Sequence, residues 1–154
     1  MGNYKVFDAM SFELDDAFHK LTPEEMKDQF PDEGPGSVAF FTEDGQMRIL
    51  MYHKKVNPLM LAIADKKTMR ASVNQNFRNA NPTYECLENY AYMVDGKKHY
   101  GLRYKMETSL GPRLGDSILL TRKGNYIMVS VSYTSEQEEW AIQVISDLLA
   151  TIKF

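Results

Sequence analysis

The sequence predicts a single α+β domain in which one antiparallel sheet lies between helices. Three pairs of strand-like segments are each joined by a short turn, which makes the paired strands antiparallel. Amphipathic helical segments precede, separate and follow these pairs. With 154 residues, 44% of them hydrophobic and 25% charged, the chain has the size and composition of one globular domain. We therefore expect residues 1–154 to form a single domain.

The first expected elements are a short strand from Met10 to Leu14 and a helix that follows it. The segment Thr22-Pro23-Glu24-Glu25 combines an N-cap threonine, a proline at the first helical position and a glutamate three residues after the cap. This pattern predicts a helix that starts at Pro23 and runs to about Phe30, because Pro31 cannot continue it.

The first hairpin is expected from Ser37 to Val56, with its turn at Asp44-Gly45, a dipeptide that tolerates positive φ angles. Asn57-Pro58 then interrupts the strand pattern. Asp65 can cap a second helix, in which apolar residues recur at helical spacing. These residues are Met69, Val73, Phe77 and Ala80. The outer side of this helix is expected to carry Lys67, Asn74 and Arg78.

The second hairpin turns at Asp95-Gly96, and a two-residue turn fixes which residues face one another. One face is apolar and is expected in the core: Leu87, Ala91, Met93, Tyr100, Leu102 and Tyr104. The other face pairs Tyr92 with His99, Tyr90 with Gly101 and Glu88 with Arg103. This mixed face would suit a protein contact surface, because tyrosine and arginine are preferred at interfaces. Alternatively, a helix partly covers it, with Tyr90 shielding Gly101.

The third hairpin turns at Lys123-Gly124, between a strand around Ile118 to Arg122 and a strand from Asn125 to Tyr133. Both faces of this hairpin are apolar, which predicts a central strand pair covered on both sides. The segment Ser135-x-x-Glu138 predicts a capping box for a last amphipathic helix that packs on the sheet. In total we expect seven strands and three helices.

This order of elements resembles the PsbP/Mog superfamily, whose fold is a seven-stranded antiparallel sheet between helices. The matching features are Met10 to Leu14 leading into the Thr-Pro-Glu-Glu helix, the Asp95-Gly96-Lys97-Lys98 hairpin, and Lys123 to Tyr126 followed by Ser135 and Trp140-Ala141. Members of that family mostly bind other proteins, such as photosystem subunits, the Ran GTPase or secretion effectors. The resemblance therefore implies a protein-binding or chaperone-like role. No family binding residue can be carried over to this chain.

Several functional classes lack support in the sequence. The formal net charge of −3 argues against a general nucleic-acid binder, and no apolar run is long enough to insert into a membrane. The histidines and the single cysteine, Cys86, lack the spacing of metal ligands, and Gly111 to Gly115 lacks the Lys-Ser/Thr end of a phosphate loop. We expect no catalytic, cofactor-binding or metal-binding residues, no cofactor, and a non-enzymatic protein.

Charge is unevenly distributed along the chain. Residues 1–46 contain 11 acids and 3 bases, residues 47–105 contain 4 and 11, and residues 106–154 contain 6 and 4, giving net charges of −8, +7 and −2. The basic middle block is either solvated surface or complementary to an acidic protein partner. The residues predicted to bind such a partner are Tyr90, Tyr92, His99, Arg103, Lys67 and Arg78.

The function predicted from these observations is a protein-binding or chaperone-like module. The alternative is a small-molecule carrier or an enzyme that uses a pocket beneath Gly111 to Gly115. As written, the chain has no secretory signal and is expected in the cytoplasm, unless a signal peptide has been removed. The sequence leaves open whether the protein is a monomer or a homodimer.

Overall fold

A computed structural model describes residues 1–154. The strands are β1 (Gly2–Val6), β2 (Met10–Leu14), β3 (Phe18–Lys20), β4 (Ser37–Thr42), β5 (Arg48–Lys55), β6 (Glu85–Val94), β7 (Lys97–Thr108), β8 (Gly111–Arg122) and β9 (Asn125–Tyr133). The helices are α1 (Pro23–Gln29), α2 (Pro58–Ile63), α3 (Lys66–Ala80) and α4 (Glu138–Thr151).

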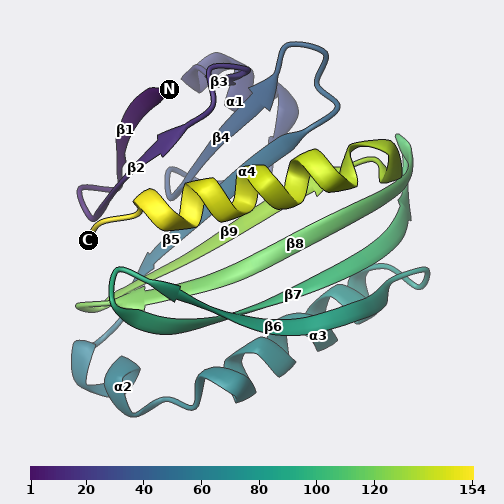
Figure 1. Cartoon of the computed structure of the whole chain (residues 1–154). Helices are drawn as coiled ribbons and strands as arrows, with labels where there is room; N and C mark the ends of the chain where they lie inside the picture. The colour runs from purple at the N-terminus through teal and green to yellow at the C-terminus, as the bar shows by residue number, and fades with distance from the viewer.

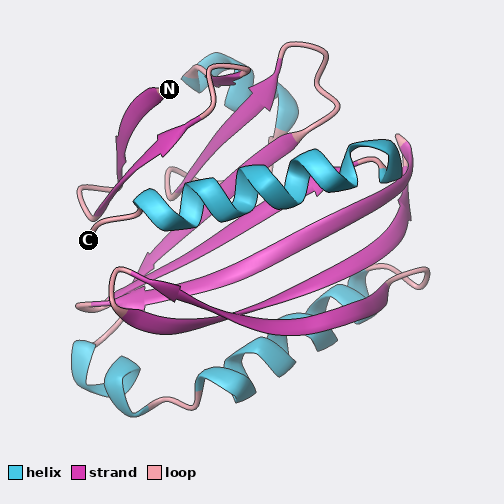
Figure 2. Cartoon of the chain, in the orientation of Figure 1, coloured by secondary structure: helices cyan, strands magenta, loops and turns pink.

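Seven strands form one antiparallel sheet in the order β3-β4-β5-β9-β8-β7-β6. Helix α4 and the β1–β2 hairpin cover one face, and α1 and α3 pack on the other (Figures 1 and 2). The predicted fold class, an antiparallel seven-stranded sheet between helices, is confirmed. The β8–β9 pair lies near the middle of the sheet, as the apolar residues on both of its faces predict.

The main core lies between α4, the β1–β2 hairpin and the sheet, and contains 22 buried residues. Helix α4 contributes the largest helical share because its apolar stripe faces the sheet: Ala141, Val144, Ile145, Leu148 and Leu149 are all buried. On the opposite face, one small cluster forms beside α1 around Ala39 and Phe41, and a second forms under α3 around Leu102 and Tyr104. Each face of the sheet therefore buries its own apolar set.

The termini of the fold are joined through the β1–β2 hairpin. Ser11 and Lys153 exchange two backbone hydrogen bonds, of 2.8 and 2.9 Å, so the segment after α4 pairs with β2. This corrects one sequence prediction: the strand Met10–Leu14 exists but belongs to a separate two-stranded sheet. The seventh strand of the main sheet is instead β3, whose three residues are too few to produce an alternating pattern.

Helix α2 was not predicted, because Asn57-Pro58 was interpreted only as an interruption. The same dipeptide is a helix start: the Asn57 side chain accepts hydrogen bonds from the N–H groups of Leu59 and Met60, and Pro58 occupies the first turn. The capping box before α4 also lies one residue earlier than predicted, since Gln137 Oε1 accepts hydrogen bonds from the Thr134 N–H and hydroxyl.

The two tight hairpins are confirmed with their predicted register. In Asp95-Gly96 and Lys123-Gly124 both residues have positive φ angles, as a type I′ turn requires. Strand β6 is an edge strand, however, and this places part of the predicted core in solvent. Met93 is 66% exposed and Leu87 is 46% exposed. Leu87 lies at a β-bulge, where the pairing with β7 shifts between Cys86 and Glu88. Asn74 also departs from its predicted outward position, since it accepts a hydrogen bond from the Tyr84 hydroxyl.

Gly101 illustrates how closely the second hairpin packs. The Tyr90 ring lies over it, so that a Cβ atom at residue 101 would be 2.5 Å from Tyr90 Cε2. The ring cannot easily move away, because the Tyr90 hydroxyl is hydrogen-bonded to Asp116. Only glycine leaves the space that this ring position needs.

We predict that Gly101→Ala lowers the free energy of unfolding by about 1–3 kcal/mol, since the added methyl group must displace Tyr90. The control is Gly34→Ala, where an added Cβ atom has nothing within 4 Å. Urea denaturation of both variants measures the difference. Equal stability of the two variants would contradict the packing role of Gly101.

Candidate functional site

A buried carboxylate, Asp116 on β8, lies next to the mixed face of the second hairpin, where it is paired with Arg103 of β7. It has no solvent exposure and accepts hydrogen bonds from three side chains on three neighbouring strands. The hydroxyls of Tyr90 (β6) and Tyr133 (β9) donate to its two oxygens at 2.5 Å each. Arg103 (β7) binds both oxygens through Nε and Nη2 at 3.0–3.2 Å. We call these four residues the Asp116 cluster.

The electrostatics of the Asp116 cluster favour a structural role. Burial, together with the nearby charge of Asp116, raises the pKa of the Tyr90 and Tyr133 hydroxyls, so both stay protonated as donors. Burial alone would lower the pKa of Arg103, but its hydrogen bonds with Asp116 outweigh this and the pKa lies above the usual value. Both carboxylate oxygens are hydrogen-bonded, which leaves the carboxylate poorly placed for proton transfer.

The six residues predicted to bind a partner lie in different parts of the structure. Tyr90 and Arg103 belong to the Asp116 cluster, and Tyr92 is half-buried beside Tyr90. Lys67 and Arg78 are exposed on α3, on the opposite side of the sheet. The six residues therefore do not form one surface. The mixed face of the second hairpin can be buried because the polar groups of the Asp116 cluster form hydrogen bonds with one another.

His99 departs furthest from the predicted surface position, since it is only 2% exposed. Its Nδ1 lies 3.5 Å from the Thr121 N–H, and its Nε2 is buried without a hydrogen-bond partner. Burial, reinforced by the charges of Arg122, Lys97 and Lys66, lowers the His99 pKa to about 4. His99 is therefore neutral at physiological pH and cannot be a direct surface contact.

The fold gathers much of the basic middle block at one end of the sheet, the left-hand end in Figure 1. The end of β5, the starts of α3 and β7, and the β8–β9 turn meet here because paired strands share this end. We call this surface the basic end, and it comprises Lys54, Lys55, Lys66, Lys67, Lys97, Lys98, Arg122 and Lys123. Among these eight residues, only Arg122 forms an ion pair, at 3.9 Å from Asp95.

Helix α2 adds exposed apolar side chains to the basic end. Leu59, Met60 and Ile63 are 76%, 65% and 82% exposed, while Leu61 is the one buried residue of the helix. Pro58 packs against the β8–β9 turn, where a Cβ atom on Gly124 would be 2.9 Å from Pro58 Cγ. The turn thus holds α2 in place with its apolar side chains facing solvent.

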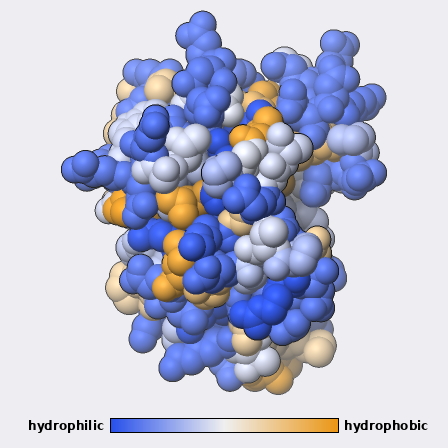
Figure 3. All heavy atoms as spheres, turned by 90° about the vertical axis from the view of Figure 1, so that its right-hand side faces the viewer, coloured by the Kyte–Doolittle hydropathy of each residue, from blue (hydrophilic) through white to orange (hydrophobic).

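The opposite end of the molecule, which faces the viewer in Figure 3, is mainly hydrophilic with small apolar patches. Two adjacent segments there, 42–47 and 134–139, contain carboxylates and no basic residue. The acidic residues in these segments are Glu43, Asp44, Glu136, Glu138 and Glu139. Arg48 and Arg113 donate to the carbonyl oxygens of Gly45 and Gln46, so basic side chains also lie beside these carboxylates.

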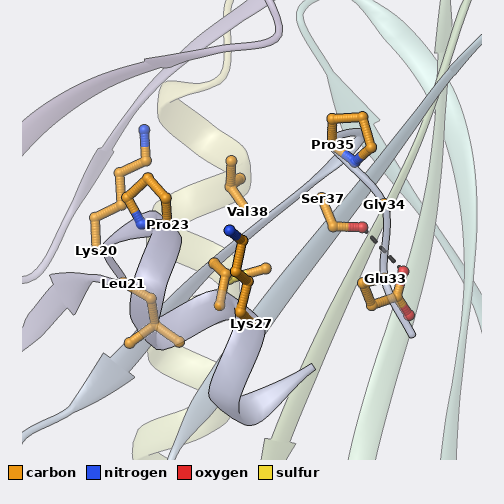
Figure 4. Close-up of a pocket in the computed structure, with 10 residues that line it drawn as sticks. Lys20, Leu21, Pro23, Lys27, Glu33, Gly34, Pro35, Ser37 and Val38 are labelled. Atoms are coloured by element: carbon orange, nitrogen blue, oxygen red, sulfur yellow. Dashed lines mark hydrogen bonds between the residues drawn. The ribbon is translucent and has the colours of Figure 1, made fainter. Parts of the chain in front are cut away.

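A cavity of about 530 Å³ lies between α1 and the start of β4. Leu21, Pro23, Met26 and Val38 supply apolar walls (Figure 4). Lys27 extends from α1, and the Ser37 hydroxyl donates to Glu33 across the opening. We call it the edge pocket.

The alternative pocket expected beneath Gly111 to Gly115 takes a different form. These residues are the first part of strand β8 and not a loop, since the turn lies at Ser109-Leu110. A hollow of about 400 Å³ does lie beside them and includes Pro112, Arg113 and Leu114. No group of three or more His, Cys, Asp or Glu side chains could hold a metal ion. No helix is long and apolar enough to span a bilayer.

The sequence analysis missed Asp116 and the apolar residues of α2. Asp116 had a signal, because it is a carboxylate two residues before the segment Ile118 to Arg122, which was predicted to be apolar on both faces, and it is the only carboxylate in β8. The apolar residues of α2 had one as well, since Leu59, Met60 and Ile63 follow a helix-starting Asn-Pro pair. Neither signal identifies the partners, which come from distant segments.

The architecture is that of PsbP/Mog-like proteins, and comparison with solved structures shows the same fold. PsbP from Synechocystis sp. PCC 6803 superposes with a TM-score of 0.70 at 13% identity, covering 99% of this chain and 91% of that one. The Ran-binding protein Mog1p from Saccharomyces cerevisiae gives 0.64 at 10% identity, with 99% and 95% covered. A protein of unknown function from Pseudomonas aeruginosa, PA94, gives 0.54 at 14% identity, with 96% and 95% covered. No protein-family model and no curated protein matches the sequence.

We predict that Asp116→Asn lowers the free energy of unfolding by about 3–5 kcal/mol, because it leaves a buried guanidinium without its counter-charge. Arg103→Met should cost a similar amount, and the double variant should cost less than the sum of the two. Chemical denaturation of all three gives the coupling energy. The control is Glu88→Gln, since the exposed Glu88 lies 3.6 Å from Arg103 and should contribute little. Additive losses would rule out a cooperative cluster.

A second prediction concerns pH. The His99 pKa is about 4 in the folded protein and 6.5 in a model compound, so the unfolded chain binds an additional proton between these values. Acidification from pH 6.5 to 4 should therefore lower the free energy of unfolding, with about 1–3 kcal/mol due to His99. His99→Gln should remove that part of the pH dependence. The comparison of wild type and variant isolates it from the carboxylates, and parallel curves would contradict the prediction.

Proposed function

We propose that this protein is a non-enzymatic protein-binding module whose contact surface is the basic end together with helix α2. The observation that carries the proposal is the position of Leu59, Met60 and Ile63, exposed on a short helix beside basic residues. Exposed apolar side chains surrounded by polar groups are typical of protein interaction sites. Unpaired basic groups favour an acidic partner and accelerate its association.

The solved structures with this fold are compatible with a binding role. Mog1p is described as a Ran-binding protein, but 10% identity transfers only the fold and not the partner. Of the residues predicted from sequence, Lys67 belongs to the proposed surface. Tyr90, Tyr92, His99 and Arg103 act through the core, and Arg78 lies toward the other end of α3.

A second candidate function is the binding of a small apolar ligand in the edge pocket. Its volume of about 530 Å³ falls within the range of about 300–1,000 Å³ that is usual for small-molecule sites. Lys20 and Lys27 line the edge pocket, and their ammonium groups are able to form an ion pair with an acidic group on such a ligand. The proposed protein contact lies at a different place, so the two functions are separable by mutation.

The protein-binding proposal predicts that the double variant Leu59→Gln, Ile63→Gln loses its partner. Affinity capture from the native host, with partners identified by mass spectrometry, provides the binding protein for kinetic measurements. The variant should dissociate at least about tenfold faster, because central apolar contacts contribute most of the binding energy. Association should slow as salt is raised from 0.1 M to 1 M, since the screening length falls from about 10 Å to about 3 Å.

Leu110→Gln is the matched control, because Leu110 is also exposed but lies in the β7–β8 turn, at the end of the sheet opposite the basic end. It should leave both rates unchanged. Loss of binding in the Leu110 variant, or unchanged dissociation in the α2 variant, would exclude α2 as the contact.

A further inference from the structure

A small cavity of about 120 Å³ lies between α2 and the β8–β9 turn. Four of the residues that line it are basic: Lys66, Lys97, Arg122 and Lys123. None of the other lining residues is a carboxylate, since these are Pro58, Leu61, Ala62, Thr121 and Gly124. The four basic side chains come from α3, β7, the end of β8 and the adjoining turn. The fold thus brings four positive charges together around one hollow.

Three of these four charges have no ion-pair partner within the molecule. Lys66, Lys97 and Lys123 form no ion pair, and Arg122 reaches Asp95 only at 3.9 Å. Lys66 instead donates to the carbonyl oxygen of Leu61, which fixes its ammonium group at the cavity wall. Desolvation and the charge of Lys97 lower the Lys66 pKa, as expected where like charges converge.

The wall of the cavity is rigid enough to hold this geometry. At Gly124, with φ +81°, a Cβ atom would approach Pro58 Cγ and the Val56 carbonyl oxygen to 2.9 Å, so α2 and the turn are in close contact. Thr121 lines the cavity and its backbone N–H points to the buried His99 ring. The buried imidazole of His99 experiences the same positive charges of Arg122, Lys97 and Lys66.

We propose that this cavity binds a compact oxyanion of the phosphate class. Such an anion would offset the repulsion among the four basic groups and accept hydrogen bonds from lysine and arginine donors. The volume corresponds to roughly four water molecules at about 30 Å³ each, which suits a single tetrahedral group. Free phosphate and a phosphate group carried by a partner are the two sources of such an anion. The inference goes beyond the proposed function, since phosphate can occupy the cavity without any protein partner.

Inorganic phosphate is the probe, with sodium chloride at the same ionic strength as the reference. Phosphate should raise the melting temperature more than chloride does, and NMR titration should shift the amide signals of Thr121 to Gly124. The double variant Lys97→Gln, Lys123→Asn should bind phosphate at least about tenfold more weakly, because two direct charges are lost. Asparagine is chosen because Lys123 has a positive φ of 51°.

The control variant Lys54→Gln, Lys98→Gln removes two charges from the basic end outside the cavity, and should bind phosphate within about twofold of wild type. Equal weakening in both variants would show diffuse counter-ion attraction and overturn the site. Shifts confined to other amides in the wild-type protein would do the same, even if the cavity variant fails to fold.

A leucine-containing peptide with one phosphoserine distinguishes the two sources of the anion. Binding tighter than inorganic phosphate, and weakened by Leu59→Gln, would place the phosphate group on a partner chain, whereas equal affinity would indicate a small molecule. Both results support the cavity. If phosphate fails to bind while the α2 variant still loses its protein partner, the cavity is not a phosphate site, and the protein-binding role of α2 is still supported.

Discussion

The hydrogen-bonded ion pair between Asp116 and Arg103 is the interaction on which the sheet depends. Its carboxylate joins four adjacent strands, because Tyr90, Arg103 and Tyr133 approach it from β6, β7 and β9. A buried charge is tolerated only when every polar group around it is satisfied. A shift of β6, β7 or β9 by one residue would turn the side chain that this strand supplies to the other face and remove one of the three partners of Asp116. The cluster therefore specifies the register of half the sheet.

This constraint also explains the position of the basic end. Once the register of β6 to β9 is set, the β6–β7 turn, the β8–β9 turn and the start of β7 must lie at the same end of the sheet. Their lysines and Arg122 are adjacent in space for that reason, although they are separated in sequence. Helix α2 then joins the same surface through the contact between Pro58 and Gly124. A feature of the interior thus determines the charge pattern of the exterior.

The hairpins, α1, α3 and α4 were predictable because their signals are local: turn dipeptides, capping residues and apolar periodicity. The pairing of Tyr90 with Gly101 and of Glu88 with Arg103 followed from one two-residue turn. The solvent exposure of Met93 was not predictable, because an alternating pattern does not reveal which strand is at an edge. The Asp116 cluster and the surface formed by α2 and the basic end were not predictable for a similar reason, since the three partners of Asp116 and the neighbours of α2 come from remote segments.

Helix α4 comes after every strand of the fold, and this order affects how the chain folds during synthesis. Helix α4 covers part of the main core and follows all nine strands, so the apolar residues beneath it stay uncovered until residues 138–153 have left the ribosome. A vectorially emerging chain can form its hairpins early, but this part of their apolar face has no cover until then. The main core is therefore completed only after all nine strands have been made. Until α4 docks, the apolar residues that it covers are exposed and can associate with other nascent chains.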